Sequence, residues 1–360
     1  MTDISRRKKE HLDIAVGAES QTDADPGWSD VHLVTASFPV AGPDDLDLSV
    51  ALGGCHLAAP LMIAGMTGGH PAALVINERL ATVAEDMGIA VGSGSQRAAL
   101  RDRSLIPTFS ILRSVAPNAV IVANIGVCQL VTQGDEDPLN RDDILRVVDM
   151  LDAQLLAVHL NVLEELIQPG GDRSVTGLLD AIAQVVQWSP VPVVVKETGS
   201  GLRKEAADAI AATGAAAIDV GGAGGTSFAR IEGTRARQQG DMRGARLGET
   251  FGDWGIPTAS AIIEARGAGV PLIATGGVRT GLDAAKAIAL GATVVGLGRP
   301  ALLAALESEE ALRKELAAFI DELRLATSLV GASDPGTLQR HRPVLTGAVL
   351  NWVNQRALKW

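Results

Sequence analysis

The chain has 360 residues, 47% of them hydrophobic and 20% charged, which favours a large buried core over disorder. Its formal net charge of −11 argues against general nucleic-acid binding, which requires a basic surface. No apolar run reaches the ~18 residues of a membrane span, and the basic N-terminus lacks the apolar segment of a secretory signal. Because Cys55 and Cys128 are too few for a disulfide framework, we expect reduced thiols in a cytoplasmic protein.

Eight short apolar runs recur along the chain, and most segments between them have helical periodicity. Runs that are apolar throughout indicate strands buried on both faces, as in a parallel sheet. Eight alternating units over roughly 240 residues predict an α/β fold, a TIM (β/α)8 barrel, whereas a doubly wound sheet is the alternative. The expected strands are Pro60–Ala64, Ile89–Gly92, Val120–Ala123, Leu155–His159, Val191–Val195, Ala217–Val220, Pro271–Ala274 and Thr293–Gly296.

Three segments do not fit the repeat. Residues 1–59 are expected to form an N-terminal extension and lid, residues 60–306 the barrel, and residues 307–360 a C-terminal helical segment of the same domain. The last segment starts with an amphipathic helix predicted at Glu307–Leu329. The stretch from Gly221 to Pro257, rich in Gly and Arg, is predicted to be a long loop that closes over a site.

Polar clusters follow the predicted strands, at the barrel face that carries active sites. Thr275–Arg279 and Gly296–Arg299 are glycine-rich turns after the seventh and eighth strands, each leading to a helix N-terminus. Such turns expose backbone N–H groups that bind a phosphate, and a nearby Arg adds a charge-assisted contact. Lys196, at the end of the fifth strand, is placed to neutralise an anionic or electron-rich ring.

The fourth strand is followed by His159, Asn161 and the adjacent carboxylates Glu164 and Glu165. Two glutamates that open a helix are often only favourable charges at its positive end. The alternative is a polar site at the carboxyl end of a strand, where an α/β protein keeps its chemistry. The other strand-end clusters favour the second interpretation.

Further motifs occur along almost the whole chain. Together with those above they are Arg7-Lys8 with His11, Met66–Gly69, Gly94–Arg97, Ala123–Gly126, His159–Asn161, Gln168-Pro169 with Gly171–Arg173, Val195–Glu197, Gly224–Ser227, Asp253–Thr258 and Gly276–Arg279. No single motif is decisive, but their order and number are specific. Taken together, they resemble the type 2 isopentenyl-diphosphate isomerases, which are FMN-dependent TIM-barrel enzymes.

The resemblance implies interconversion of isopentenyl and dimethylallyl diphosphate by proton addition and removal at reduced FMN, with Mg²⁺, and with NAD(P)H or another reductant priming the flavin. It also implies a homo-oligomer, a tetramer or octamer, in which the basic N-terminal cluster is a lid supplied by a neighbouring subunit. The implied substrate contacts are Arg7, Lys8, His11, Ser95, Arg97, His159 and Asn161, and Glu165 is the implied Mg²⁺ ligand. The implied FMN contacts are Met66, Thr67, Gly68, Ser93, Asn124, Lys196, Thr226, Gly276, Gly277, Arg279 and Gly298.

The chain departs from the family pattern at Glu164, where the family normally has glutamine. A carboxylic acid can deliver a proton, which an amide does not easily do. One hypothesis is an ordinary isomerase with Glu164 as its catalytic proton relay. The others are a family member acting on another prenyl or allylic diphosphate, and a weakly active or non-catalytic flavoprotein.

A different enzyme class, the FMN-dependent 2-hydroxy-acid oxidases, needs a His base beside the seventh strand. The chain has no histidine between the sixth and seventh strands, which argues against that chemistry. Barrels that act on inosine monophosphate need a nucleophilic Cys after the sixth strand, and none is present there.

Overall fold

The computed structural model describes residues 3–360 and contains a closed barrel of eight parallel strands in the order β10-β11-β4-β5-β6-β7-β8-β9. All eight expected strands are present, so the predicted TIM barrel is confirmed. β6 and β8 run on to Gly126 and Glu197, so Asn124 and Lys196 lie within strands and not after them. The strands are β4 (Leu61–Ile63), β5 (Ala90–Gly92), β6 (Val120–Gly126), β7 (Leu155–Leu160), β8 (Val193–Glu197), β9 (Ala217–Asp219), β10 (Leu272–Ala274) and β11 (Val294–Leu297).

Helices surround the barrel, and their apolar faces pack against the outward residues of the strands. Side chains define several helix starts: Thr280 and Asp283 form a reciprocal cap on α12. The helix predicted at Glu307–Leu329 is present as one helix that begins at Glu309, because Ser308 caps its start. The surrounding helices are α2 (Ala73–Asp86), α3 (Arg97–Arg101), α4 (Pro107–Val115), α5 (Arg141–Asp149), α6 (Val162–Ile167), α7 (Leu178–Trp188), α8 (Lys204–Ala212), α11 (Thr258–Ala265), α12 (Gly281–Leu290), α13 (Arg299–Glu307) and α14 (Glu309–Leu329).

One end of the barrel is closed by the hairpin of β2 (Val50–Leu52) and β3 (Cys55–Leu57). Its two-residue turn, Gly53-Gly54, has φ values of +56° and +83°, a left-handed pair that glycine adopts readily. The hairpin contributes Leu52 and Leu57 to the apolar cluster inside the barrel. Apolar side chains therefore fill most of this end of the barrel.

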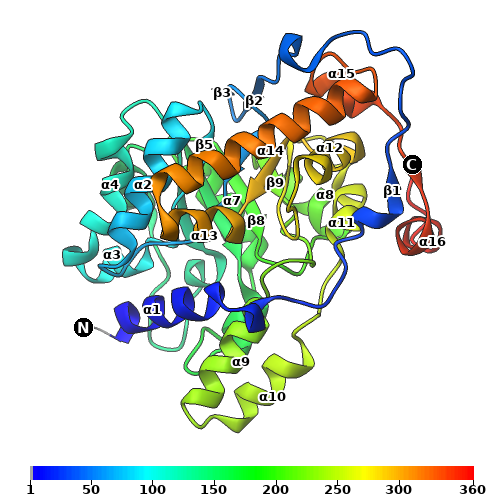
Figure 1. The fold of residues 1–360 in the computed structure, drawn as a ribbon. Helices are drawn as coiled ribbons and strands as arrows, with labels where there is room; N and C mark the ends of the chain where they lie inside the picture. The colour runs from blue at the N-terminus through cyan, green and yellow to red at the C-terminus, as the bar shows by residue number, and fades with distance from the viewer. Residues whose placement is uncertain (1–2) are drawn as a thin grey trace.

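Helix α1 (Asp3–Val16) lies across the opposite end, where the hairpin of α9 (Phe228–Gln238) and α10 (Met242–Thr250) projects from the body (Figure 1). The prediction of a long loop at 221–257 is therefore wrong. The two helices pack closely because Gly233 faces Gly248: a Cβ on Gly233 would lie 2.7 Å from the Cα of Gly248. The insertion thus forms a rigid wall and not a flexible cover.

The C-terminal residues pack against the same barrel. β12 (Val344–Leu345) pairs with β1 (Val31–His32), and α15 (Pro335–Arg340) and α16 (Gly347–Gln355) flank that pair. Trp352 donates a hydrogen bond to Glu264 at 2.9 Å, and Arg266 lies over the Trp360 ring. Among the helices of residues 3–360, none is long and apolar enough to cross a membrane.

Candidate active site

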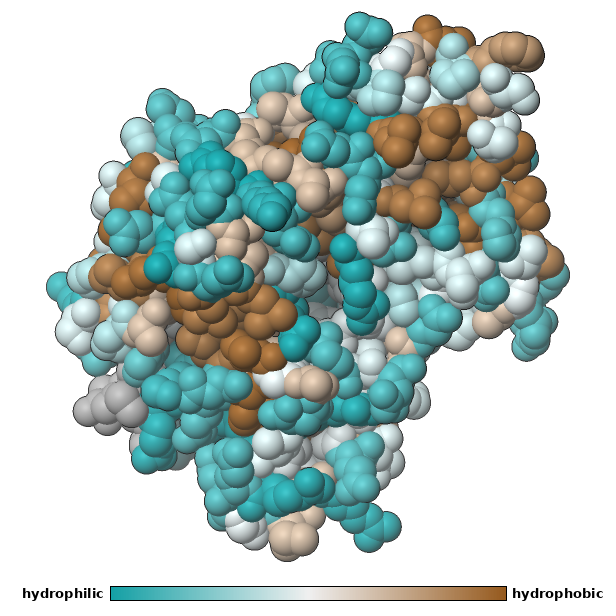
Figure 2. Space-filling view, in the orientation of Figure 1, coloured by the Kyte–Doolittle hydropathy of each residue, from teal (hydrophilic) through white to brown (hydrophobic). Residues whose placement is uncertain are grey.

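A cavity of about 670 Å³ opens at the carboxyl end of the barrel, beneath α1. Its lining comes from β6, β7, β8 and β11, from the loops that follow the other four strands, and from α1 and α13. In the space-filling view hydrophobic residues gather where α13 and α1 lie (Figure 2), and the cavity lining there includes Leu12, Leu302 and Leu303. The predicted site residues in the lining are Lys8, His11, Met66, Thr67, Gly68, Ser95, Asn124, His159, Glu164, Lys196, Thr226, Gly276, Gly277, Arg279 and Gly298.

The glycine-rich turns after β9 and β10 lie against each other on one side of the cavity. Gly276 and Gly277 have φ values of +102° and +66°, a left-handed pair that orients successive backbone N–H groups. A Cβ on Gly277 would lie 2.5 Å from the oxygen of Gly224, and Arg279 Nη2 donates to the same oxygen at 3.0 Å. Next to this turn, a Cβ on Gly298 would meet only Met66 Sδ, at 3.8 Å. Close backbone packing thus holds the Gly276-Gly277 turn in place, and a turn of this kind could hold the phosphate of FMN.

Lys196 extends from β8 into the cavity and forms an ion pair with Asp219 in the cavity floor. Its Nζ lies 3.6 Å from Oδ2 of Asp219, whose other oxygen accepts a 2.6 Å hydrogen bond from Thr275. Asp219 is buried, so the pair fixes the position of the lysine in the floor of the cavity. The ammonium can thus face an electron-rich ring at the position predicted for the flavin.

His159 is oriented by its neighbour on β6. Asn124 donates through Nδ2 to the carbonyl of Ser93 at 2.9 Å, which turns its Oδ1 toward His159 Nδ1, 2.8 Å away. From this network we assign the proton to Nδ1. Burial lowers the pKa of His159 to about 3, and the charges of Lys196 and Lys8 add to the effect. His159 is therefore neutral near pH 7.

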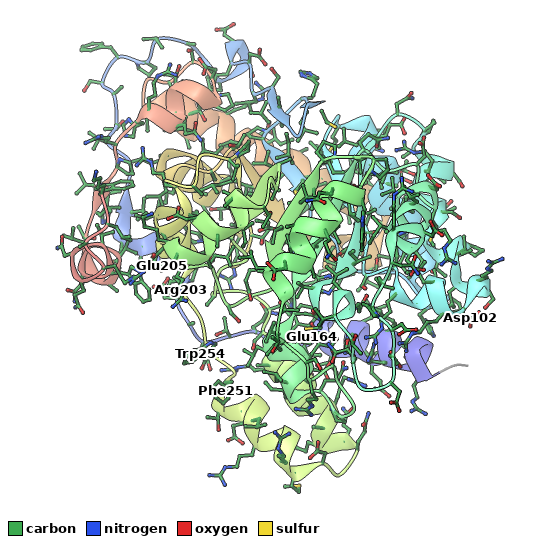
Figure 3. All side chains as sticks on the ribbon, turned by 180° about the vertical axis from the view of Figure 1, so that it is seen from behind. Asp102, Glu164, Arg203, Glu205, Phe251 and Trp254 are labelled. Atoms are coloured by element: carbon green, nitrogen blue, oxygen red, sulfur yellow. The ribbon has the colours of Figure 1, made fainter. Side chains whose placement is uncertain are left out.

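The two glutamates open helix α6, and the structure separates their roles. Glu165 is buried and accepts hydrogen bonds from Asn161 Nδ2 at 2.9 Å, Gln168 Nε2 at 3.1 Å and the Asp172 N–H at 2.9 Å. The Glu164 carboxylate lines the cavity, and the hydrogen bonds and ion pairs of the described residues include none to it. Figure 3 shows Glu164 on the side of the barrel nearest α1 and α9. Burial raises the pKa of Glu164 to about 8, and Glu232 and Glu165 add to the effect.

Five predicted residues lie behind the cavity wall: Arg7, Ser93, Arg97, Asn161 and Glu165. Arg97 binds both oxygens of Asp172, at 2.9 and 3.3 Å, and is committed to that carboxylate. By contrast Ser95, which lines the cavity, has a buried Oγ without a hydrogen-bond partner among the described residues. That hydroxyl is available to a ligand.

Helix α1, which carries Lys8 and His11, is held over the cavity by contacts within its own chain. Arg299 donates to the last carbonyls of α1, those of Ala15 and Val16, at 3.2 and 2.7 Å. Arg235 on α9 binds Glu10 at 3.0 Å, which joins the two helices.

Glu232 on α9 is a residue that the sequence did not single out. Its side chain is fully buried, and it binds His11 Nε2 through Oε1 and Arg235 Nη1 through Oε2, both at 2.5 Å. Glu197 was also passed over, although it lines the cavity and accepts three backbone hydrogen bonds, from Thr198, Gly199 and Ser200. Despite those donors, burial raises the pKa of Glu197 to about 7. For Glu232, the sequence offered one sign of importance: Arg235, three residues later, could form an ion pair with it on a helix.

Solved structures with a similar fold include mandelate oxidases. One is a mutant with a monooxide FMN adduct (TM-score 0.61, 18% identity, 94% of this chain and 92% of that one). Another is mandelate oxidase with (S)-4-hydroxymandelic acid (TM-score 0.62, 18% identity, 95% and 98%). At this identity the likeness concerns the fold alone.

Other proteins have a much higher sequence identity to this chain. The isopentenyl-diphosphate delta-isomerase of Methanosarcina acetivorans is 44% identical over 355 residues, covering 98% of this chain and 95% of that protein. The protein of the same name from Methanothermobacter thermautotrophicus is 41% identical over 357 residues, covering 99% and 97%. A family model described as FMN-dependent dehydrogenase matches residues 155–344. The chain belongs to the FMN-dependent, type 2 isopentenyl-diphosphate delta-isomerase family.

Proposed function

We propose that the chain interconverts isopentenyl and dimethylallyl diphosphate, with FMN reduced by NAD(P)H or another donor. One observation carries the proposal: a single cavity holds the Gly276-Gly277 turn and Lys196 on one side, and Lys8, Ser95 and the carboxyl of Glu164 elsewhere on its wall. When bound, reduced FMN supplies an electron-rich face at which an allylic carbon skeleton can gain and lose a proton.

In this proposal Glu164 holds the proton. Its raised pKa, about 8, keeps the carboxyl protonated near pH 7. Because no hydrogen bond to a described residue fixes the group, it can turn toward a substrate in the cavity. Lys8 and Ser95 face the same space and are suited to bind the diphosphate, while His159 contributes a neutral ring. Leu12, Leu302 and Leu303 keep water from the hydrocarbon end.

Four of the predicted substrate and metal contacts can reach the cavity in this proposal only if α1 and the α6 loop shift when substrate binds. They are Arg7, Arg97, Asn161 and Glu165. Glu165 fits Mg²⁺ poorly in the present geometry, because its oxygens already accept three hydrogen bonds and do not line the cavity. In this proposal, no step of the reaction depends on Mg²⁺ bound to Glu165. The homo-oligomer and the cytoplasmic location remain predictions.

Anaerobic incubation of the FMN-loaded, reduced protein with Mg²⁺ and isopentenyl diphosphate in D₂O tests the proposal. We expect dimethylallyl diphosphate and deuterium uptake, with a loss on the order of 10²–10⁴ in rate for Glu164→Gln. Absence of both product and deuterium would refute the isomerase assignment.

A longer prenyl diphosphate is the second candidate substrate, and the apolar cavity wall at Leu302 and Leu303 favours it. A Glu164→Gln variant that gains activity on isopentenyl diphosphate would support this second assignment. Comparing kcat/KM for isopentenyl diphosphate with that for longer chains, in both proteins, separates the two candidates.

A further inference from the structure

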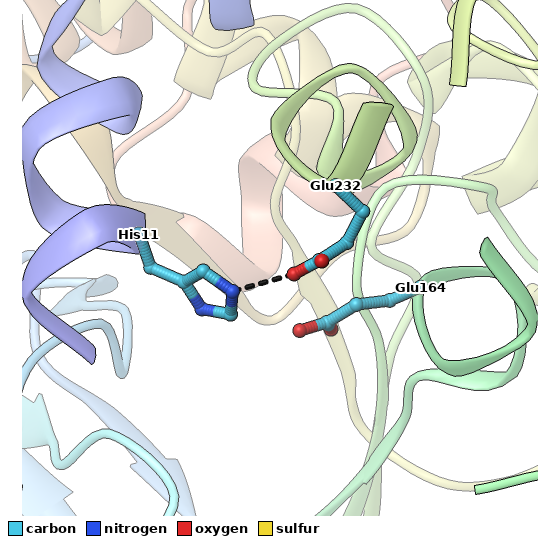
Figure 4. A group of neighbouring side chains, drawn as sticks. All are labelled: His11, Glu164 and Glu232. Carbon is cyan, nitrogen blue, oxygen red and sulfur yellow. Dashed lines mark hydrogen bonds and ion pairs between the residues drawn. The ribbon is translucent and has the colours of Figure 1, made fainter. Parts of the chain in front are cut away.

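Three side chains from three different helices meet at the cavity wall. They are His11 of α1, Glu164 of α6 and Glu232 of α9, and one nitrogen and two carboxylate oxygens lie within 4.8 Å of one another. Figure 4 shows the Glu164 carboxylate pointing toward the other two residues. Segments separated by more than 60 residues in the chain thus bring together the atoms that bind a divalent cation.

We propose that His11, Glu164 and Glu232 form a binding site for a divalent transition metal of the Zn²⁺ class. Imidazole nitrogens and carboxylate oxygens both bind Zn²⁺, and a site with three protein ligands leaves a fourth position open. An imidazole ligand also favours such an ion over Mg²⁺, which prefers oxygen ligands.

The geometry needs only small movements. Bonds of about 2.0–2.2 Å to a tetrahedral ion place ligand atoms roughly 3.3 Å apart. The His11–Glu232 contact of 2.5 Å would open by less than about 1 Å, and the widest separation, at most 4.8 Å, would close by roughly 1.5 Å. The Glu164 side chain is free to make the larger movement, because no hydrogen bond to a described residue holds it.

The charges around the three residues leave one carboxylate without a direct ion pair. Glu232 is neutralised by Arg235, with which it forms an ion pair at 2.5 Å. Glu164 lies beside Glu232 and forms no ion pair within 4.0 Å among the described residues, so Lys8 and Arg7 attract it only from a longer distance. A carboxylate in such a setting needs a proton or a cation, and the adjacent imidazole favours a metal ion.

Arg235 and Glu10 support the proposed site from behind. Arg235 is buried and fixes Glu232 Oε2, which leaves Oε1 directed at His11. A ligand held by a second partner in this way is typical of metal sites. The proposed function places a proton on Glu164, and a bound ion would displace that proton. An occupied site would therefore oppose isomerisation; that consequence rests on the proposed function, whereas metal binding does not.

Calorimetric titration of the full-length flavoprotein with Zn²⁺, without substrate, tests the site. We expect one ion per chain, and a loss of affinity of at least about tenfold in Glu164→Gln and in His11→Asn. His70→Asn is the matched control, because His70 lines the same cavity outside the group, and we expect it to bind as the wild type does. Millimolar Mg²⁺ should not displace the ion.

Two results would overturn the proposal: no stoichiometric Zn²⁺ binding, or the same affinity in wild type, Glu164→Gln and His11→Asn. Displacement by equal concentrations of Mg²⁺ would overturn the transition-metal assignment. Thermal melts without metal check that each variant is folded, and Glu164→Gln is suited to this because it replaces a carboxylate by an amide of the same size.

Discussion

The ion pair between Arg235 and Glu232 anchors the wall of the active site, and its removal should be costly. Arg235 is 5% exposed and Glu232 is fully buried, so Arg235→Gln leaves a buried carboxylate with His11 as its remaining partner. Removing one partner of a buried ion pair costs about 3–5 kcal/mol. Because the contact of Glu232 with His11 remains, we expect this variant to lose about 3 kcal/mol in its free energy of unfolding. With an unfolding entropy of about 2.1 cal/mol/K per residue, that loss lowers the Tm by about 4 °C for a protein of this size.

Arg237→Gln is the matched control on the same helix. Arg237 lies 3.6 Å from Glu249, but these side chains are 64% and 77% exposed, so the pair is worth about 0–1 kcal/mol. Urea unfolding of the three proteins, followed by circular dichroism, gives the free energies of unfolding. Equal losses in the two variants would refute the assignment of a buried, supporting pair.

The same pair has a definite pH dependence. Burial would raise the pKa of Glu232, but attraction to His11 and Arg235 outweighs it and leaves the pKa below the usual 4.5. A carboxyl with a lowered pKa stabilises the folded state above the usual value, and this contribution is lost as the pH falls through the folded pKa. The difference in stability between wild type and Arg235→Gln should therefore shrink below about pH 4.5.

Three further predictions concern the cavity. Lys196→Met should weaken FMN binding by about 10–100-fold in a fluorescence titration, because a charge-assisted contact is worth about 1.5–3 kcal/mol; unchanged affinity would remove Lys196 from the flavin site. Gly277→Ala should be more destabilising in urea than Gly54→Ala: both glycines have positive φ, but only at Gly277 does a Cβ meet backbone within 3 Å. His159 should stay neutral from pH 8 to 5 in NMR titrations. The folded-state pKa of His159, about 3, lies below the usual 6.5, so the contribution of His159 to stability is present above pH 6.5 and is lost as the pH falls. An NMR titration midpoint near pH 6.5 would contradict the buried environment assigned to His159.

The sequence predicted the barrel because its strands are buried on both faces and read as unbroken apolar runs. It did not predict the β2–β3 hairpin or the β1–β12 pair, whose strands have two or three residues and whose partners are set by tertiary packing. The helices α9 and α10 were taken for a loop because glycine and arginine suggested irregular chain. The spacing of Gly244 and Gly248, one helical turn apart, was the signal for close helix packing.

The cavity lining was largely predictable, since strand ends in a barrel meet at one face. The different surroundings of Glu164 and Glu165 were not predictable, because neighbours on a helix point in different directions and only the fold decides which one faces the cavity. Glu232 was missed for a similar reason. It reaches the site only because α9 folds back against α1, a contact between residues more than 200 positions apart.

The central claim is isomerisation without net redox change, and one measurement tests it most directly. The protein, with its FMN reduced anaerobically and all reductant then removed, is given an excess of isopentenyl diphosphate with Mg²⁺. We predict many molecules of dimethylallyl diphosphate per flavin, with the flavin spectrum still that of the reduced form at the end. No product, or the oxidation of one flavin for each product molecule formed, would contradict the account.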